Sequence, residues 1–259
     1  MIELLDSNVL GESSQGGGGN SKKYNLTMNC IVGDVDSNGV LQVLTAKEDA
    51  IFTGVKKISE KALYYKFYNA SLKDVEFSDL EEITETLSCS YAFYGSSVET
   101  VSFPKLKKIV GNQSCSYMFG NCSNLTSVSF PELEEIGDSN CVRQMFGITA
   151  IEEVSFPKLT KITNMIGMFS YSSSLRTIRF DTLKSLPSGS SVAFTQSTNL
   201  SVYFPSLETI DVDAFKFSGT QATNLTYHFK AGMESVVQGL TDYPLFNATS
   251  GNLTIVYDL

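Results

Sequence analysis

The sequence predicts a mainly β solenoid of about eight to nine repeats, each 24–28 residues long. Three observations predict it. An apolar pattern recurs around one aromatic anchor, the anchors are almost evenly spaced, and charged residues alternate in sign between copies. A fixed period of about 20–30 residues is typical of solenoids, in which each unit buries its apolar face only by stacking on its neighbours.

The repeat has the form apolar-x-x-apolar-x-Phe-x-x-apolar-x-x-apolar. One copy places Val98, Val101, Phe103, Leu106 and Ile109 at these positions. The anchors are Phe52, Phe77, Phe103, Phe130, Phe156, Phe180, Phe204, Phe229 and Tyr257. We therefore expect equivalent anchors to become neighbours in a single core.

The first half of each repeat is expected to be one short strand. Val101 and Phe103 would point inward and Ser102 outward, because side chains alternate along a strand. Proline directly follows several anchors and marks the strand end, since it cannot donate to a ladder. The second half is rich in Gly, Ser and Asn, which predicts loops and short turns. It carries a second aromatic at Phe93, Phe119, Phe146, Phe169, Phe194 and Phe215.

Charged residues after the anchors support stacking independently. The copies carry Lys56-Lys57, Glu81-Glu82, Lys107-Lys108 and Glu134-Glu135, and a second set reads Asp79, Lys105, Glu132 and Lys158. Strands about 4.8 Å apart would bring these opposite charges together. The alternation is expected to fail at Lys161 and Lys184, where the stacking would change.

The chain divides into four predicted parts. Residues 1–23 contain a glycine run, which is typical of a flexible linker; an ordered anchor into a larger assembly is the alternative. Residues 24–44 are expected to form an N-terminal capping hairpin, 45–246 the repeats, and 247–259 a C-terminal capping strand. Asp34 and Asp36 imitate the opening of a calcium loop, but the position of the bidentate Glu holds Thr45. We expect no metal there.

Bulk composition excludes several partners. Nineteen basic and twenty-eight acidic residues give a net charge of −9, which disfavours nucleic acid and anionic membranes. No apolar run approaches the ~20 residues of a membrane helix, and the N-terminus lacks the features of a signal peptide.

The cysteine count is odd, and Cys89, Cys115 and Cys141 lie 26 residues apart. We expect a column of reduced, buried thiols.

The run from Leu106 to Pro131, with Tyr117-Met118-Phe119-Gly120-Asn121-Cys122 at its centre, resembles the BspA-like (treponemal-type) leucine-rich repeats. The resemblance covers roughly residues 50 to 230. It implies a curved leucine-rich-repeat solenoid with a continuous sheet, displayed on bacterial surfaces and used for adhesion. It implies neither catalysis nor a cofactor. Related repeats also resemble modules of bacteriophage and prophage proteins.

The residues themselves give no support for an enzyme. The single histidine, His228, lies in a predicted strand, and no nucleophile-elbow sequence is present. Glutamate pairs such as Glu81-Glu82 and Glu134-Glu135 are explained by lysines in adjacent copies. We expect no catalytic residue, no metal site and no cofactor.

The best candidate surface is the exposed side of the sheet. One residue before each anchor stands a row of side chains, namely Glu76, Ser102, Ser129, Ser155, Arg179, Tyr203 and His228. Arg and Tyr are enriched in interface hot spots, and solenoids usually bind through an extended repeat surface. We predict a non-enzymatic adhesion module that binds a protein or glycan on a cell surface, and that is itself extracellular or on the surface of a bacterium. The alternative is a virion component attached through residues 1–23.

Overall fold

The structure is a computed structural model that describes residues 25–28, 33–35, 41–43, 49–53, 56–58, 60–137, 140–187, 197–211, 214, 223–241 and 253–259. The predicted linker 1–23 lies outside the described residues, as do Cys30, Phe194 and Phe215. The division into four parts therefore remains a prediction.

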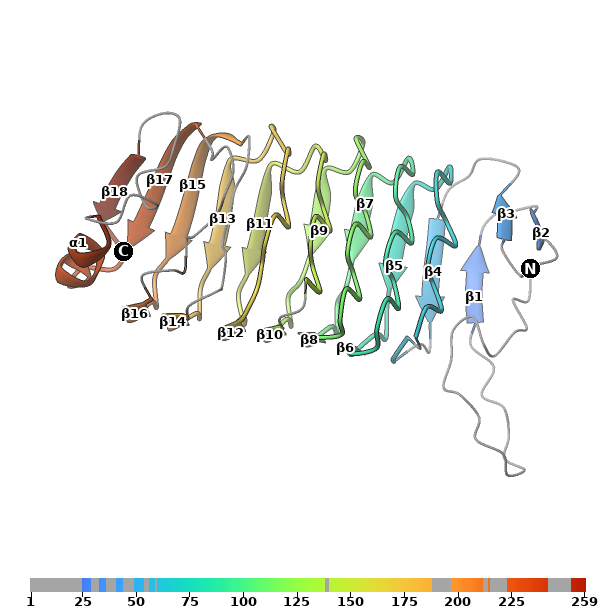
Figure 1. Cartoon of the computed structure of the whole chain (residues 1–259). Coiled ribbons are helices and arrows are strands. Elements are labelled where there is room, and N and C mark those ends of the chain that lie inside the picture. The colour runs from blue at the N-terminus through green and yellow to red at the C-terminus, as the bar shows by residue number, and fades with distance from the viewer. Residues whose placement is uncertain are drawn as a thin grey trace, which may run out of the picture.

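The predicted solenoid is confirmed. In the described part of the chain, nine strands lie side by side in one row, as Figure 1 shows, and each pairs in parallel with its neighbour except between β9 and β11. They are β4 (Asp49–Thr53), β5 (Asp74–Phe77), β7 (Thr100–Ser102), β9 (Ser127–Ser129), β11 (Glu153–Phe156), β13 (Thr177–Phe180), β15 (Thr198–Phe204), β17 (Thr223–Phe229) and β18 (Leu253–Tyr257). The missing pairing means that the expected continuous sheet is two five-stranded sheets placed end to end, the first of which also contains β1 (Asn25–Met28).

A second strand in most repeats was not predicted. Two-residue strands form a further parallel row along the lower edge of the array in Figure 1. They are β6 (Glu82–Ile83), β8 (Lys108–Ile109), β10 (Glu135–Ile136), β12 (Lys161–Ile162), β14 (Ser185–Leu186) and β16 (Thr209–Ile210). The first four pair with one another and the last two form a separate pair. Each repeat thus turns a corner after its anchor and makes a second ladder.

The remaining side of each repeat is a run of overlapping turns, as in residues 60–69, 86–95 and 112–121. We call this side the turn face. Alternate amides donate to the next repeat: the N–H of Leu63 to the carbonyl of Ser88 and that of Phe67 to Ala92, both at 2.8 Å. The amides between them close turns within the repeat. Stacking therefore satisfies backbone groups that an isolated repeat would leave unpaired.

Two aromatic columns run through the core, one formed by the anchors and the other, in the described residues, by second aromatics from Phe67 to Phe169. The anchor rings stack on one another, with 5.2 Å between the centroids of Phe77 and Phe103, the same from Phe103 to Phe130, and 5.6 Å from Phe130 to Phe156. The second column stacks in the same way, with Phe93 and Phe119 at 5.0 Å. Edge contacts join the columns, as between Phe103 and Phe119. All of these rings are fully buried.

At the N-terminal end the strands pair differently from the predicted hairpin, whereas the strand expected near the C-terminus is present as β18. The strand expected around residues 24–30 is β1 (Asn25–Met28), but it pairs antiparallel with β4 rather than with the strand after it. That later strand, β3 (Leu41–Val43), pairs with β2 (Gly33–Val35). An unpredicted helix α1 (Glu234–Thr241) lies at the same end of the array as β18 in Figure 1 and buries Val237 and Leu240.

The charge alternation forms ion pairs between neighbouring repeats. Lys56 pairs with Glu81, Lys57 with Glu82, Lys105 with Asp79, Lys108 with Glu135, and Lys158 with Glu132. The hydrogen bond from Lys56 lowers the pKa of Glu81. Glu134 also lies directly beside Lys107, because its N–H donates to the Lys107 carbonyl at 2.9 Å.

As expected, the alternation of sign fails between Lys161 and Lys184, because both of these successive copies are basic. Lys161 pairs with Glu135 on the preceding strand at 2.5 Å, and Lys184 pairs with Glu208 on the following repeat at 3.7 Å. Each lysine therefore has an acidic neighbour on one side. What changes between them is the short-strand ladder, which ends at β12 and begins again at β14.

The predicted cysteine column is confirmed. Cys89, Cys115 and Cys141 are reduced cysteines with no exposed surface, and so is Cys122. Burial raises the pKa of the Cys115 thiol, and it raises the pKa of Cys122 to about 12. These thiols are packing groups, since the thiolate is the reactive form.

Candidate functional site

The predicted side chains form a real line across the strands, which we call the contact row. Pairing places Glu76 beside Ser102 and Ser102 beside Ser129. It then places Ser155 beside Arg179, Arg179 beside Tyr203, and Tyr203 beside His228. The intervening residues, such as Val101 and Ile178, are buried. The row therefore lies on the outward side of the sheet because strand side chains alternate.

The C-terminal end of the contact row is tightly interconnected. The Arg179 guanidinium lies 4.7 Å from the centre of the Tyr203 ring, and that ring stacks on His228 at 4.2 Å. Nδ1 of His228 is 3.0 Å from a carboxylate oxygen of Asp258, and Nε of Arg179 is 3.3 Å from Asp181. Cation–π contact and paired carboxylates hold these side chains in place. Asp258 was not among the predicted residues.

The middle of the contact row coincides with an opening in the sheet. β9 and β11 are neighbours in the row, but they share no ladder. Elsewhere the ladder is regular: the N–H of Phe103 donates to Ser129, and the N–H groups of Arg176 and Thr177 donate to Glu152. The equivalent bonds between β9 and β11 are not formed. The anchors beneath still stack, so the opening is confined to the surface of the sheet.

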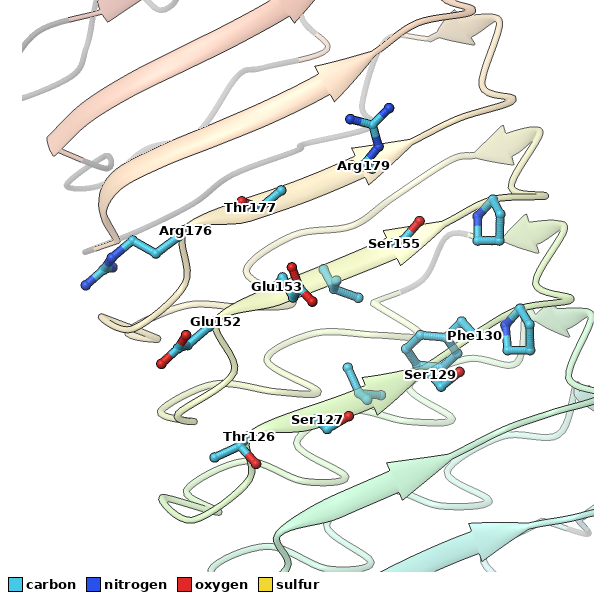
Figure 2. Close-up of a pocket in the computed structure, with 14 residues that line it drawn as sticks. Thr126, Ser127, Ser129, Phe130, Glu152, Glu153, Ser155, Arg176, Thr177 and Arg179 are labelled. Atoms are coloured by element: carbon cyan, nitrogen blue, oxygen red, sulfur yellow. The ribbon is translucent and has the colours of Figure 1, made fainter.

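A hollow of about 720 Å³ lies over this opening, and we call it the sheet hollow. Figure 2 shows Ser127 and Ser129 from β9, Glu153 and Ser155 from β11, and Thr177 and Arg179 from β13 on the same face. Glu152 and Arg176 lie at the strand starts, where the Arg176 guanidinium donates to carbonyls of Ser173, Leu175 and Thr198. The hollow therefore has a hydroxyl-rich floor with charged groups around it.

The predicted residues thus separate into three groups. Ser129, Ser155 and Arg179 line the sheet hollow. Tyr203 and His228 extend from Arg179 toward the C-terminal end. Glu76 and Ser102 lie in the same row but outside the hollow, and Glu76 accepts a hydrogen bond from Ser78 at 2.6 Å. Their role as binding residues remains a prediction.

A tyrosine cluster on the turn face was missed. Tyr65, Tyr91 and Tyr117 stack at 4.7 Å, and Tyr68 stacks on Tyr94 at 5.4 Å. Three of the positions adopt positive φ, near 55°, which is uncommon for a bulky residue. The 26-residue spacing of Tyr65, Tyr91 and Tyr117 was visible in the sequence. Because the rings cover one another's faces, they present mainly edges and hydroxyl groups.

Side chains that could ligate a metal ion are dispersed among the described residues. Among them, no three His, Cys, Asp or Glu side chains gather where they could hold a metal ion. His228 pairs with Asp258, but no described hydroxyl forms a hydrogen bond with its ring. Nor does the described chain contain a helix with the length and apolarity to cross a bilayer.

The repeat pattern decides the family. The family model of the BspA type leucine rich repeat region matches six copies, over residues 50–166 and 87–223. The chain belongs to this family. The six matched copies are slightly fewer than the predicted eight to nine. Leucine-rich-repeat solenoids of this kind are typically non-enzymatic scaffolds. A comparison with curated proteins finds no match for the chain, and a comparison with solved structures finds none.

Proposed function

We propose that this BspA-type protein is a non-enzymatic binding module that attaches to a protein or glycan on a cell surface, acting at the surface of a bacterium or outside it. The contact row is the surface that makes the attachment. The observation that carries this proposal is the connected series Arg179, Tyr203, His228 and Asp258, which is partly exposed next to the sheet hollow.

Physical reasons favour this series as an anchor for a partner. Tyr and Arg dominate interface hot spots, and an anchor that is already immobilised loses little entropy on binding. The Tyr203 ring is held between Arg179 and His228, so its hydroxyl and edges are fixed before contact. Surface display is what membership of the family favours. The exposed strand residues beside the contact row have mostly small side chains, which would not obstruct an extended partner.

The test is binding of the labelled full chain to intact epithelial and bacterial cells. We expect saturable binding that falls by about tenfold or more when Arg179→Ala and Tyr203→Ser are combined, because hot-spot residues each contribute more than about 1 kcal/mol. A turn-face variant, Tyr91→Asn, is the matched control. Asn tolerates the positive φ at this position, so the control removes a ring without straining the backbone.

Two treatments of the cells identify the partner class. Protease removes protein partners, and periodate cleaves the vicinal diols of glycans. Saturable binding that requires Arg179 and Tyr203 supports the proposal whichever treatment abolishes it. No saturable binding by the wild type, or equal binding by the double variant, contradicts it.

A further inference from the structure

The sheet hollow has the dimensions of a small-ligand site. Its volume of about 720 Å³ lies within the range of about 300–1,000 Å³ that is common for such sites. A stable protein interface buries about 800 Å² on each partner, which is more than a hollow formed on three short strands supplies. The hollow therefore fits a small molecule, or a few units of a polymer.

The geometry excludes an inserted peptide strand. The stacked rings of Phe130 and Phe156, beneath β9 and β11, have centroids 5.6 Å apart. A strand placed between β9 and β11 would need them about 9.6 Å apart, twice the usual spacing of about 4.8 Å. The opening leaves backbone groups without ladder partners but does not leave room for another strand. Those groups remain available to a ligand that lies on top.

The charges around the hollow favour an uncharged ligand. Glu152 and Glu153 stand against Arg176 and Arg179, so the formal charges of the lining residues sum to zero. Both arginines are held by other groups: Arg176 by three carbonyls and Arg179 by Asp181. An anionic ligand would meet the glutamates, and a cationic ligand would meet the arginines.

The hydrogen-bonding groups indicate a ligand rich in hydroxyls. The floor carries the hydroxyls of Ser127, Ser129, Ser155 and Thr177, and each can donate and accept. Carboxylates can only accept and guanidinium groups can only donate. A ligand hydroxyl can satisfy all three kinds of group. The lining contains no Tyr or Trp, and its one aromatic ring, Phe130, is 1% exposed and cannot stack on a ligand, so recognition would depend on hydrogen bonds.

We propose that the sheet hollow binds a neutral oligosaccharide, with Glu153 and Arg179 on opposite sides of the sugar and the serine hydroxyls beneath it. This proposal rests on the proposed function and names the partner class for one part of the contact row. The sugar lies over β9, β11 and β13, and further units of a longer glycan extend along the row toward Tyr203.

The test uses the full chain on a printed array of neutral and acidic oligosaccharides, followed by calorimetry with the neutral oligosaccharide that binds best. We expect binding to a neutral oligosaccharide. Ser129→Tyr should abolish it because the ring fills the floor of the hollow. Glu153→Gln should weaken it by about tenfold, the effect of losing a hydrogen bond to a charged group.

Ser97→Tyr is the matched control, because Ser97 is an exposed serine that belongs neither to the contact row nor to the lining of the hollow. It should leave sugar binding unchanged, and the thermal midpoints of all variants show whether they fold. Binding only to acidic glycans, or equal loss in Ser97→Tyr and Ser129→Tyr, overturns the proposal. Cell binding that requires Arg179 but resists periodate, with no binding on the array, also overturns it and leaves the proposed function standing.

Discussion

Reversing the charge of Glu135 should destabilise the array by a predictable amount. Glu135 lies between two lysines on neighbouring short strands: Lys161 is 2.5 Å from one carboxylate oxygen and Lys108 is 4.0 Å from the other. Glu135→Lys replaces these two attractions with two repulsions. Three ammonium groups would then occupy successive rungs about 4.8 Å apart.

The size of the destabilisation by Glu135→Lys depends on how far solvent screens the charges. The Glu135 side chain is 23% exposed, whereas its partners Lys161 and Lys108 are 63% and 44% exposed, so solvent screens the pairs in part. Cross-strand charge pairs contribute about 0.2–1 kcal/mol each, and like charges cost similar amounts. Four such changes should lower the free energy of unfolding by about 1–3 kcal/mol. At 1 M salt, where the screening length is about 3 Å, most of this loss should disappear.

Urea unfolding followed by circular dichroism, at low and high salt, measures the effect. Glu135→Gln separates lost attraction from added repulsion and should cost about half as much. Glu85→Lys is the control, because no described cation forms an ion pair with Glu85. A cost for Glu135→Lys that equals the control, or that salt does not change, would refute the reasoning.

Three further perturbations test other parts of the structure. Phe130→Ala should lower the free energy of unfolding by about 3–5 kcal/mol, because the ring is buried between two others; a loss below about 1 kcal/mol in urea titration would contradict it. Gly95→Ala should cost about 1–3 kcal/mol, since Gly95 has a φ of 70° and a Cβ would lie 2.2 Å from Asn69 Oδ1; an unchanged thermal midpoint would argue against this strain. Burial raises the pKa of the Cys122 thiol from 9.0 to about 12, so the folded state favours the protonated thiol. The stabilisation from this thiol is present below pH 9 and is lost as pH rises toward 12. Urea midpoints across that window should fall, and thiol reagents should leave Cys122 unmodified until the protein unfolds.

The sequence was sufficient to predict the stacking because its signals repeat. Phe103 and Phe130 recur with the same apolar neighbours, and only an array that superposes copies brings Lys108 beside Glu135. The contact row followed from strand alternation alone, once Val101 and Phe103 were assigned to the core. Such predictions depend on the spacing of the sequence repeats and not on the exact backbone geometry.

Other features depend on geometry that the period does not specify. The opening between β9 and β11 arises from the loss of a few hydrogen bonds, although Ser129 and Ser155 look like any other strand residues. The turn-face tyrosines were missed because Tyr91 adopts a positive φ that its residue type does not favour. The sequence does contain a pattern that indicates helix α1, because Met233, Val237 and Leu240 are spaced to lie on one helix face. The segment is short and occurs once, and the sequence analysis placed it within the repeats.

The central claim is that equivalent side chains of successive repeats lie directly over one another, which makes the contact row a single surface. A double-mutant cycle on Phe103 and Phe130, each changed to Leu, tests it most directly. Stacked rings 5.2 Å apart should show a coupling energy of about 0.5–1.5 kcal/mol. The same cycle on Phe103 and Phe156, which are separated by the Phe130 ring, should show none. Equal coupling in both cycles, or none in the first, would contradict the stacked arrangement.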